Sequence, residues 1–345
     1  MNEPSVRILP VPNGAKAILT MTFDDGDLAT AKWLDREFET YGLCGSCMLI
    51  VGRNIGDTFT ENNPKAEAYR EVFSHGRLEP QAHTMTHAPT PALAWAQGEK
   101  EKFLLNNNRE NYVYELVRSK EVLQRYFPEY DILTMSSSNN TLSRCSFVQE
   151  NGELCRDEKG NFLTVADGGA EKVAKENYYA IRQGVRGNQS TDPACDNDEG
   201  GSWRSLKTHR FSDGGGTVAG AVSWLDSAIA DGAWLITLCH HITADSGDFD
   251  FEKADAFFAG CAESVKDGSL VCMKFSDAVK YIRERQNAVL NVGEDGKTLT
   301  LTLKERTADG LRLPYSVFNY PLSVEAETPD GKRLLTLRPG ETAVF

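Results

Sequence analysis

The chain has 345 residues, of which 40% are hydrophobic and 25% charged, and its formal net charge is −13 at pH 7. This length suffices for one large core, or for one large core and a small satellite domain. The negative charge repels nucleic-acid phosphates and anionic lipid surfaces, so we expect no nucleic-acid partner and a neutral or cationic substrate. No apolar run approaches the length that crosses a bilayer, which argues against membrane insertion.

The first sixteen residues contain no charged segment followed by an apolar stretch, so the sequence predicts no secretory signal and leaves the location of the protein open. The eight cysteines are too few for a disulfide scaffold. Cys44 and Cys47 form a CxxC pair within an apolar run, which favours core packing over a redox or zinc role. The other cysteines divide into three that can bridge if the protein is exported (Cys145, Cys155, Cys195) and three predicted to be small apolar fillers (Cys239, Cys261, Cys272).

Apolar periodicity predicts strands that alternate with helices from the N-terminus onward. A strand over 17–23 ends in Asp24-Asp25-Gly26, and a helix follows from Leu28 to a C-capping Gly42. Further strands are expected at 43–51, 80–83, 132–135, 178–181, 233–239 and 270–275, and further helices at 65–74, 113–127, 222–229, 251–265 and from Ser276. This alternation over some seven units predicts a distorted (β/α) barrel of about seven parallel strands.

Two segments depart from the alternation. Residues 136–216 are rich in Gly, Asn, Asp and Ser, and we interpret them as a long insertion that caps one side of a groove and sets specificity. From 288 onward the pattern changes to strict alternation, clearest in 298–303, which is typical of antiparallel strands. The predicted domains are therefore a barrel over 1–287 and a small antiparallel β domain over 288–345.

Three polar clusters each follow a predicted strand, at the edge where parallel α/β folds gather their catalytic groups. The first is the pair Asp24 and Asp25, which can also be explained as a helix N-cap pair. The second holds His83 and His87, whose i, i+4 spacing places both rings on one side of a helical turn, where a divalent ion can bind. The third is His240-His241. His75 and His209 lack such context and are interpreted as structural or surface residues.

Together these clusters resemble the polysaccharide-deacetylase family, the NodB-homology domain of carbohydrate esterase family four. The family's first motif, TFDDG, matches residues 22–26, and its histidine pair is matched by His83-Thr84-Met85-Thr86-His87. Its last motif, leucine-x-histidine, matches 238–240. The resemblance covers roughly residues 16–285, apart from the long insertion.

The resemblance implies a metal-dependent hydrolase that removes N-acetyl groups from a glycan or an N-acetylated sugar. Asp25, His83 and His87 would be the metal ligands, Asp24 the general base and His240 the general acid, with His241 as the second candidate for the acid. Such a set is chemically coherent, because water and an amide carbonyl both need activation and the leaving amine needs a proton. Zn²⁺ is the expected metal, and Co²⁺, Mn²⁺ or Ni²⁺ would accept the same donors.

The sequence departs from the family in its third and fourth motifs. The family's Arg-x-Pro-aromatic stretch, which orients the base, is replaced after the strand at 132–135 by Ser-Ser-Ser-Asn-Asn, and the tryptophan-bearing fourth motif is not recognisable. Arg182 or Arg186 can supply the missing cation. Two other functions stay open: an O-acetyl esterase or cyclic amide hydrolase that uses the same site, and a weakly catalytic carbohydrate-binding protein.

Overall fold

A computed structural model describes residues 5–87, 109–137, 169–193, 203–214, 216–244, 249–304, 318–328 and 331–345. Within this described chain, seven parallel strands form a closed ring in the order β3-β4-β5-β6-β7-β8-β2, and β2 pairs back with β3. The strands of the ring are β2 (Ala17–Phe23), β3 (Gly45–Leu49), β4 (Leu78–Ala82), β5 (Thr134–Ser136), β6 (Ala180–Arg186), β7 (Leu206–Arg210) and β8 (Trp234–Cys239). The predicted (β/α) barrel is confirmed.

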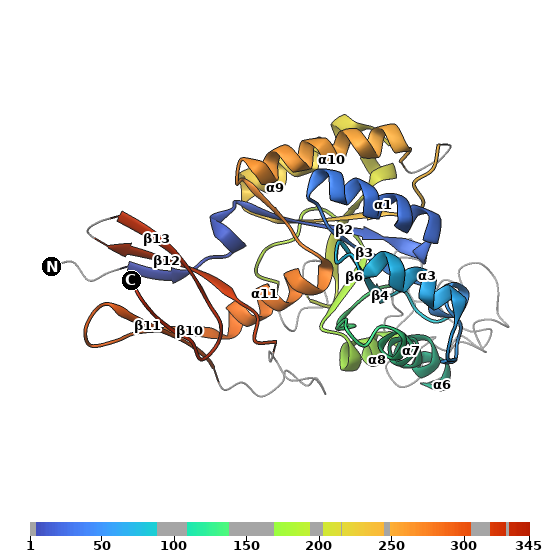
Figure 1. Ribbon diagram of the computed structural model, residues 1–345, viewed down its shortest axis with the longest axis horizontal. Helices are drawn as coiled ribbons and strands as arrows, with labels where there is room; N and C mark the ends of the chain where they lie inside the picture. Colours follow the sequence, from blue (N-terminus) through green and yellow to red (C-terminus); the bar gives the residue numbers. More distant parts are fainter. Residues whose placement is uncertain are drawn as a thin grey trace, which may run out of the picture.

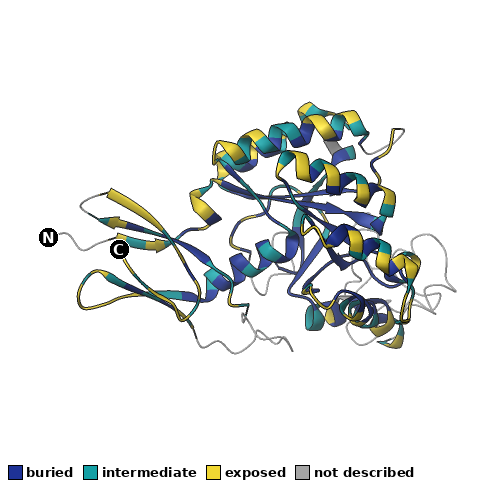
Figure 2. Ribbon diagram, viewed as in Figure 1, coloured by how far each residue is buried: buried dark blue, intermediate teal, exposed yellow. Residues whose placement is uncertain are grey.

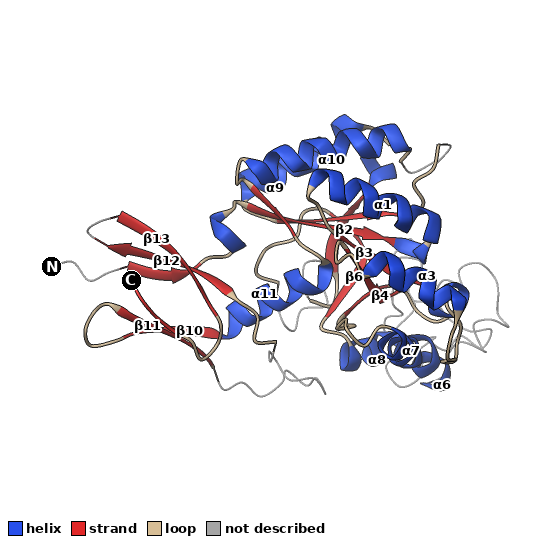
Figure 3. Ribbon diagram, viewed as in Figure 1, coloured by secondary structure: helices blue, strands red, loops and turns tan. Residues whose placement is uncertain are grey.

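Helices cover the outside of the ring, and the strands inside them are buried (Figures 2 and 3). The longer ones are α1 (Leu28–Tyr41), α3 (Pro64–Phe73), α7 (Ser119–Tyr126), α8 (Gly169–Asn177), α9 (Val218–Asp231), α10 (Phe251–Lys266) and α11 (Phe275–Asn287). Short turns of helix are η1 (Pro12–Gly14), η2 (Asp24–Gly26), α2 (Val51–Asn54), α6 (Arg109–Tyr112), the π-helical η3 (Val113–Arg118) and η6 (Phe211–Gly214). In the described part of the chain, none of these helices has both the length and the apolar character needed to cross a bilayer.

The ring is distorted where β2 changes its neighbour. The first half of β2 pairs with β9 (Leu270–Cys272), whereas its last two residues pair with β3. The strand predicted at 270–275 therefore lies beside the ring, and the seventh strand of the ring is β7, which the sequence pattern did not predict. β7 has only five residues, and its alternation of buried and half-exposed positions covers the first four of them, too short a run to stand out.

The range 136–216, interpreted from the sequence as one long insertion, contributes directly to the barrel. Its described parts hold α8, β6 and β7, and β6 and β7 connect β5 to β8 in the ring. Only the remaining parts of this range, which lie outside the described residues, are left for an insertion. Deleting the whole range would remove two neighbouring strands from the ring.

The small β domain consists of two three-stranded antiparallel sheets, β1-β12-β13 and β10-β11-β14. Their strands are β1 (Ser5–Ile8), β10 (Ala288–Val292), β11 (Thr298–Leu303), β12 (Leu322–Thr328), β13 (Gly331–Leu337) and β14 (Thr342–Val344). The N-terminal strand β1 thus joins the C-terminal strands and lies in one sheet with β12 and β13 (Figure 1). Inward residues of β11 and β12 share one apolar cluster with α11 and with the base of the barrel.

Candidate metal and catalytic site

The two aspartates of the first motif lie in η2, directly after β2 and at the carboxyl edge of the barrel. Neither caps the following helix, because the N-cap of α1 is Asp27, whose carboxylate accepts a hydrogen bond from the backbone N–H of Thr30 at 2.7 Å. Asp25 has a left-handed backbone (φ 69°), and its carbonyl oxygen accepts a hydrogen bond of 2.8 Å from Arg53 Nη2. The N-cap explanation therefore fails, and both carboxylates are available for other roles.

Gly26 is required by the close approach of its neighbours. Its φ is +63°, and a Cβ at this position would lie 2.5 Å from Leu49 Cδ2 and 2.7 Å from Asn54 Oδ1. The Gly26 carbonyl accepts hydrogen bonds from the Tyr69 hydroxyl and from Asn54 Nδ2. The glycine lets the chain turn tightly enough to bring both aspartates to the barrel edge.

The histidine motif follows β4 but is not the helical turn that its spacing predicted. Thr84 and His87 both have positive φ values, 65° and 58°, and Thr84 Oγ1 accepts a hydrogen bond of 3.0 Å from the His87 N–H. The two imidazoles nevertheless meet, with ring centroids of His83 and His87 4.8 Å apart. An irregular turn brings about the same meeting of the rings that the spacing suggested for a helix.

Glu115, which no sequence motif indicated, holds this turn in place. Its Oε2 accepts hydrogen bonds from the backbone N–H groups of Met85 (3.0 Å) and Thr86 (2.9 Å), and its Oε1 accepts one from the Thr86 hydroxyl (2.5 Å). Glu115 comes from the π-helical η3 and is buried. A glutamate in an amphipathic helix is ordinarily a solvated residue, so its role became visible only through the tertiary contact.

Three possible ligand atoms converge beside the turn. Asp25 Oδ1 lies 3.5 Å from His83 Nε2 and 3.8 Å from His87 Nε2. The donor atoms of Asp25, His83 and His87 all lie within 4.8 Å of one another. Asp25 Oδ1 is buried and has no hydrogen-bond partner in the described part of the chain, as expected of an oxygen that a cation would neutralise. One carboxylate and two imidazoles are a donor set that suits a divalent transition metal and leaves coordination positions open.

The surroundings also favour the protonation states that metal binding needs. His83 Nδ1 lies 3.0 Å from the carbonyl oxygen of Ser136 and 2.6 Å from the hydroxyl of the same residue. Because a carbonyl oxygen can only accept, we assign the His83 proton to Nδ1, which leaves the Nε2 lone pair facing Asp25. Burial, followed by the charge of His83, lowers the pKa of His87 and favours its neutral form. Burial alone would raise the pKa of Asp25, but the neighbouring His83, followed by the charges of His87 and Arg53, holds it well below its usual range.

Asp24 is buried beside this cluster and paired with a buried arginine. Only 2% of Asp24 and 0% of Arg182 are exposed, and Arg182 Nη2 donates a hydrogen bond to Asp24 Oδ1. Burial would raise the pKa of Asp24, but the charge of Arg182, aided by His83 and His240, outweighs burial and lowers it. The other carboxylate oxygen, Oδ2, lies 3.9 Å from His83 Nε2. Of the two arginines considered from the sequence, Arg182 is the one beside Asp24, and Arg186 is exposed farther along β6.

The paired histidines follow β8, which pairs with β2 on the side opposite to β3. His240 is half-buried, and its charge is among those that lower the pKa of Asp24. His241 is exposed and lines a cavity of about 370 Å³ together with Asp25 and Arg53. Asp24 is not among the described residues that line this cavity. Its contact with the candidate ligands is made by Oδ2, which lies near His83.

The remaining two histidines have structural contacts elsewhere. His75 Nδ1 lies 2.7 Å from Asp35 Oδ2, and the His209 ring stacks on Trp224 with centroids 4.6 Å apart. Both observations agree with their interpretation as structural or surface residues.

No protein-family model matches the sequence, and no curated protein matches it. Among solved structures, the chain is similar to a protein described as a polysaccharide deacetylase from Mycobacterium smegmatis, with 10% identity, TM-score 0.49, and 81% of this chain and 94% of that chain covered. It is also similar to the Xyl-CE4 domain of a multidomain xylanase from the hindgut metagenome of Trinervitermes trinervoides, with 14% identity, TM-score 0.41 and coverage of 76% and 88%. A third is the peptidoglycan deacetylase PdaC from Bacillus subtilis, with 10% identity, TM-score 0.41 and coverage of 78% and 92%.

Proposed function

We propose that the chain is a member of the polysaccharide-deacetylase family and a metal-dependent hydrolase that removes acetyl groups, primarily N-acetyl groups, from an acetylated carbohydrate. The observation that carries this proposal is the convergence of Asp25, His83 and His87 around a buried carboxylate oxygen without a hydrogen-bond partner among the described residues. A second carboxylate, Asp24, lies at the edge of the same cluster. Zn²⁺ is the metal that we expect from this donor set.

When bound, a divalent cation would polarise the acetyl carbonyl and make a water molecule more acidic. Two side chains of the protein would carry out the proton transfers. Asp24, kept ionised and oriented by Arg182, accepts the proton of the attacking water through Oδ2. His240, which directly follows β8, the strand paired with β2, donates a proton to the departing nitrogen. This donation is needed because an amide anion is too basic to leave unprotonated.

The proposal is tested by replacing Asp24 with asparagine and measuring both bound metal and acetate release from N-acetylglucosamine oligomers. We expect acetate release to fall by about 10²–10⁴-fold, as is typical when a general base is lost, with metal content unchanged. Asp27→Asn is the matched control: it makes the same change three residues away, and asparagine is an equally good N-cap, so activity should persist. Turnover that survives in Asp24→Asn would exclude Asp24 as the base.

Substrate class and the identity of the acid are resolved by two further comparisons. Acetylated xylan assayed beside the N-acetylated oligomers separates an esterase from an N-deacetylase, and sugar binding without acetate release from either would leave a carbohydrate-binding protein. His240→Asn should reduce release of the amine more strongly than His241→Asn, because the charge of His240 acts on Asp24 whereas His241 lines the outer cavity. The reverse order would transfer the role of the acid to His241.

A further inference from the structure

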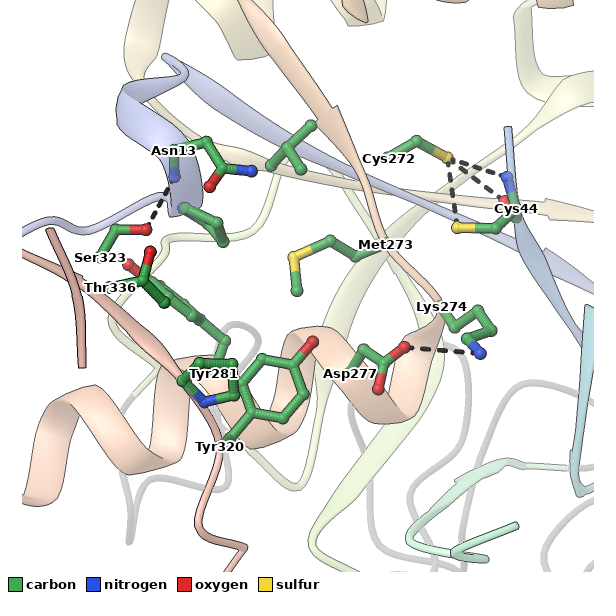
Figure 4. A pocket seen from close by; sticks show the side chains of 13 residues that line it. Asn13, Cys44, Cys272, Met273, Lys274, Asp277, Tyr281, Tyr320, Ser323 and Thr336 are labelled. Atoms are coloured by element: carbon green, nitrogen blue, oxygen red, sulfur yellow. Dashed lines mark hydrogen bonds and ion pairs between the residues drawn. The ribbon is translucent and has the colours of Figure 1, made fainter. Parts of the chain in front are cut away.

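Two cysteines lie in contact where β2 changes its pairing from β9 to β3, in the half of the barrel away from the aspartates. Cys44 comes directly before β3, and Cys272 ends β9, where it lies in register with Leu19 near the beginning of β2. Their Sγ atoms are 3.8 Å apart. Cys44 N–H donates to Cys272 Sγ at 3.5 Å, and Cys272 Sγ–H donates to the Cys44 carbonyl oxygen at 3.3 Å (Figure 4). The two side chains are thus in contact although 228 positions separate them in the sequence.

This pair is accessible, whereas other cysteines of the described chain are buried. Cys44 and Cys272 are both partly exposed and line a cavity of about 270 Å³ between the barrel and the β domain, which Met273 and Tyr320 also line (Figure 4). Cys47, Cys239 and Cys261 are buried. A small reagent in solution can therefore reach the Cys44–Cys272 pair more readily than those three thiols.

We propose that Cys44 and Cys272 form a disulfide when the protein meets a low-molecular-weight disulfide such as oxidised glutathione. One cysteine thiolate attacks the reagent and releases one reduced thiol, and the second cysteine then displaces the other, so an S–S bond replaces two S–H bonds. The two electrons reduce the reagent to two thiols, which take up the two protons that the cysteines lose. The Sγ atoms must approach from 3.8 Å to about 2.05 Å, the length of a disulfide bond.

The hydrogen bond with Cys272, together with the partial burial of the side chain, raises the pKa of the Cys44 thiol well above its ordinary value, and Asp277 acts in the same direction while Lys274 opposes it. Because the thiolate is the attacking species, a thiol held in its neutral form should exchange slowly with the disulfide reagent.

The disulfide would link the N-terminal end of β3 to β9, the two strands that pair with different parts of β2. β9 pairs with the first half of β2 and β3 with its end, so the seam between them is closed by few backbone hydrogen bonds. A covalent link across this seam also closes a loop of more than two hundred residues in the unfolded chain, which favours the folded state. The ligand cluster lies beyond the carboxyl ends of β2 and β4, so the bond should leave the metal site unchanged.

The test uses the full chain, incubated with oxidised or reduced glutathione, treated with an alkylating reagent, digested and mapped by mass spectrometry. We expect a peptide pair joined through Cys44 and Cys272 in the oxidised sample, and a thermal midpoint higher by roughly 5–10 °C that returns to the reduced value with dithiothreitol. Cys44→Ser and Cys272→Ser should each lose both effects. Cys47→Ala, which alters the buried member of the same CxxC, should keep them.

Absence of the Cys44–Cys272 peptide pair overturns the proposal, as does a bridge to Cys47 or glutathione retained on either cysteine as a mixed disulfide. An equal midpoint in the oxidised and reduced protein, with the link present, overturns the stabilising role. Neither outcome depends on acetate release, which is measured separately in the same samples, so failure of the disulfide and failure of the proposed activity are distinguishable.

Discussion

The carboxyl edge of the barrel and its base, where the β domain packs, contain contrasting kinds of interior. At the carboxyl edge the buried groups include Asp24, His83 and Arg182, and the turns next to them have positive φ values at three non-glycine residues (Asp25, Thr84, His87). At the base, the shared cluster of α11, β11 and β12 is apolar, with Leu299, Leu301 and Val324 wholly buried.

The contrast shows that the features that oppose folding are concentrated at the edge of the barrel where we propose the catalytic site. Burying charges and holding left-handed backbone both oppose folding, and they persist when the surrounding structure compensates for them. The apolar base supplies that compensation through burial that requires no special geometry. The two regions should therefore respond oppositely to mutation: the edge chiefly in metal binding and activity, the base chiefly in stability.

The largest expected effect is at the proposed metal site. His83→Ala removes one of the three proposed ligands, so bound metal and acetate release should both fall by more than about 100-fold. Elemental analysis after dialysis measures the metal directly. His209→Ala, which removes a ring stacked on Trp224 away from the cluster, is the control and should retain full metal content. Metal retained by His83→Ala would show that the cation binds elsewhere.

The second largest effect is expected at Arg182, which is paired with the buried Asp24 and should therefore influence both the stability of the protein and the proposed activity. Arg182→Met leaves the Asp24 carboxylate buried without its cation, which should lower the free energy of unfolding by about 3 kcal/mol and also reduce activity. Urea unfolding of Arg182→Met, Asp24→Asn and the double variant measures the coupling between them. If the double variant is no more stable than Arg182→Met alone, the pair is not the source of the loss.

The smallest effect on activity is expected at the base. Leu301→Ala opens a cavity in the wholly buried core of the β domain and should lower the free energy of unfolding by about 3 kcal/mol. Metal content and acetate release per folded molecule should stay unchanged, as measured by urea unfolding beside elemental analysis. Loss of metal in Leu301→Ala would show that the two regions are coupled rather than independent.

Much of the barrel and of the candidate site could be predicted, because these parts depend on apolar runs, helical periodicity and capping residues within short segments of the sequence. The apolar run of 17–23 became β2 with the predicted bounds, the periodic residues from Leu28 became α1, and Gly42 ends that helix in a left-handed conformation. Asp25, His83 and His87 lie together because each follows a strand, and parallel strands end at one edge.

The errors share a physical origin in contacts between distant segments. β7 is too short to show a period, and whether β9 lies inside or beside the ring depends on how β2 divides its hydrogen bonds. Cys272 was predicted to be an apolar filler, and nothing in its local sequence indicated that it meets Cys44.

The sequence by itself determined which residue types stand at the ends of strands, because periodicity and motif spacing are properties of neighbouring residues. Tertiary structure decided which partners those residues acquire: Arg182 beside Asp24, Glu115 beneath the histidine turn and Asp27 in place of the aspartate pair as the helix cap. Such pairings depend on how the ring closes, and ring closure is set by the packing of the whole chain rather than by any one segment of it.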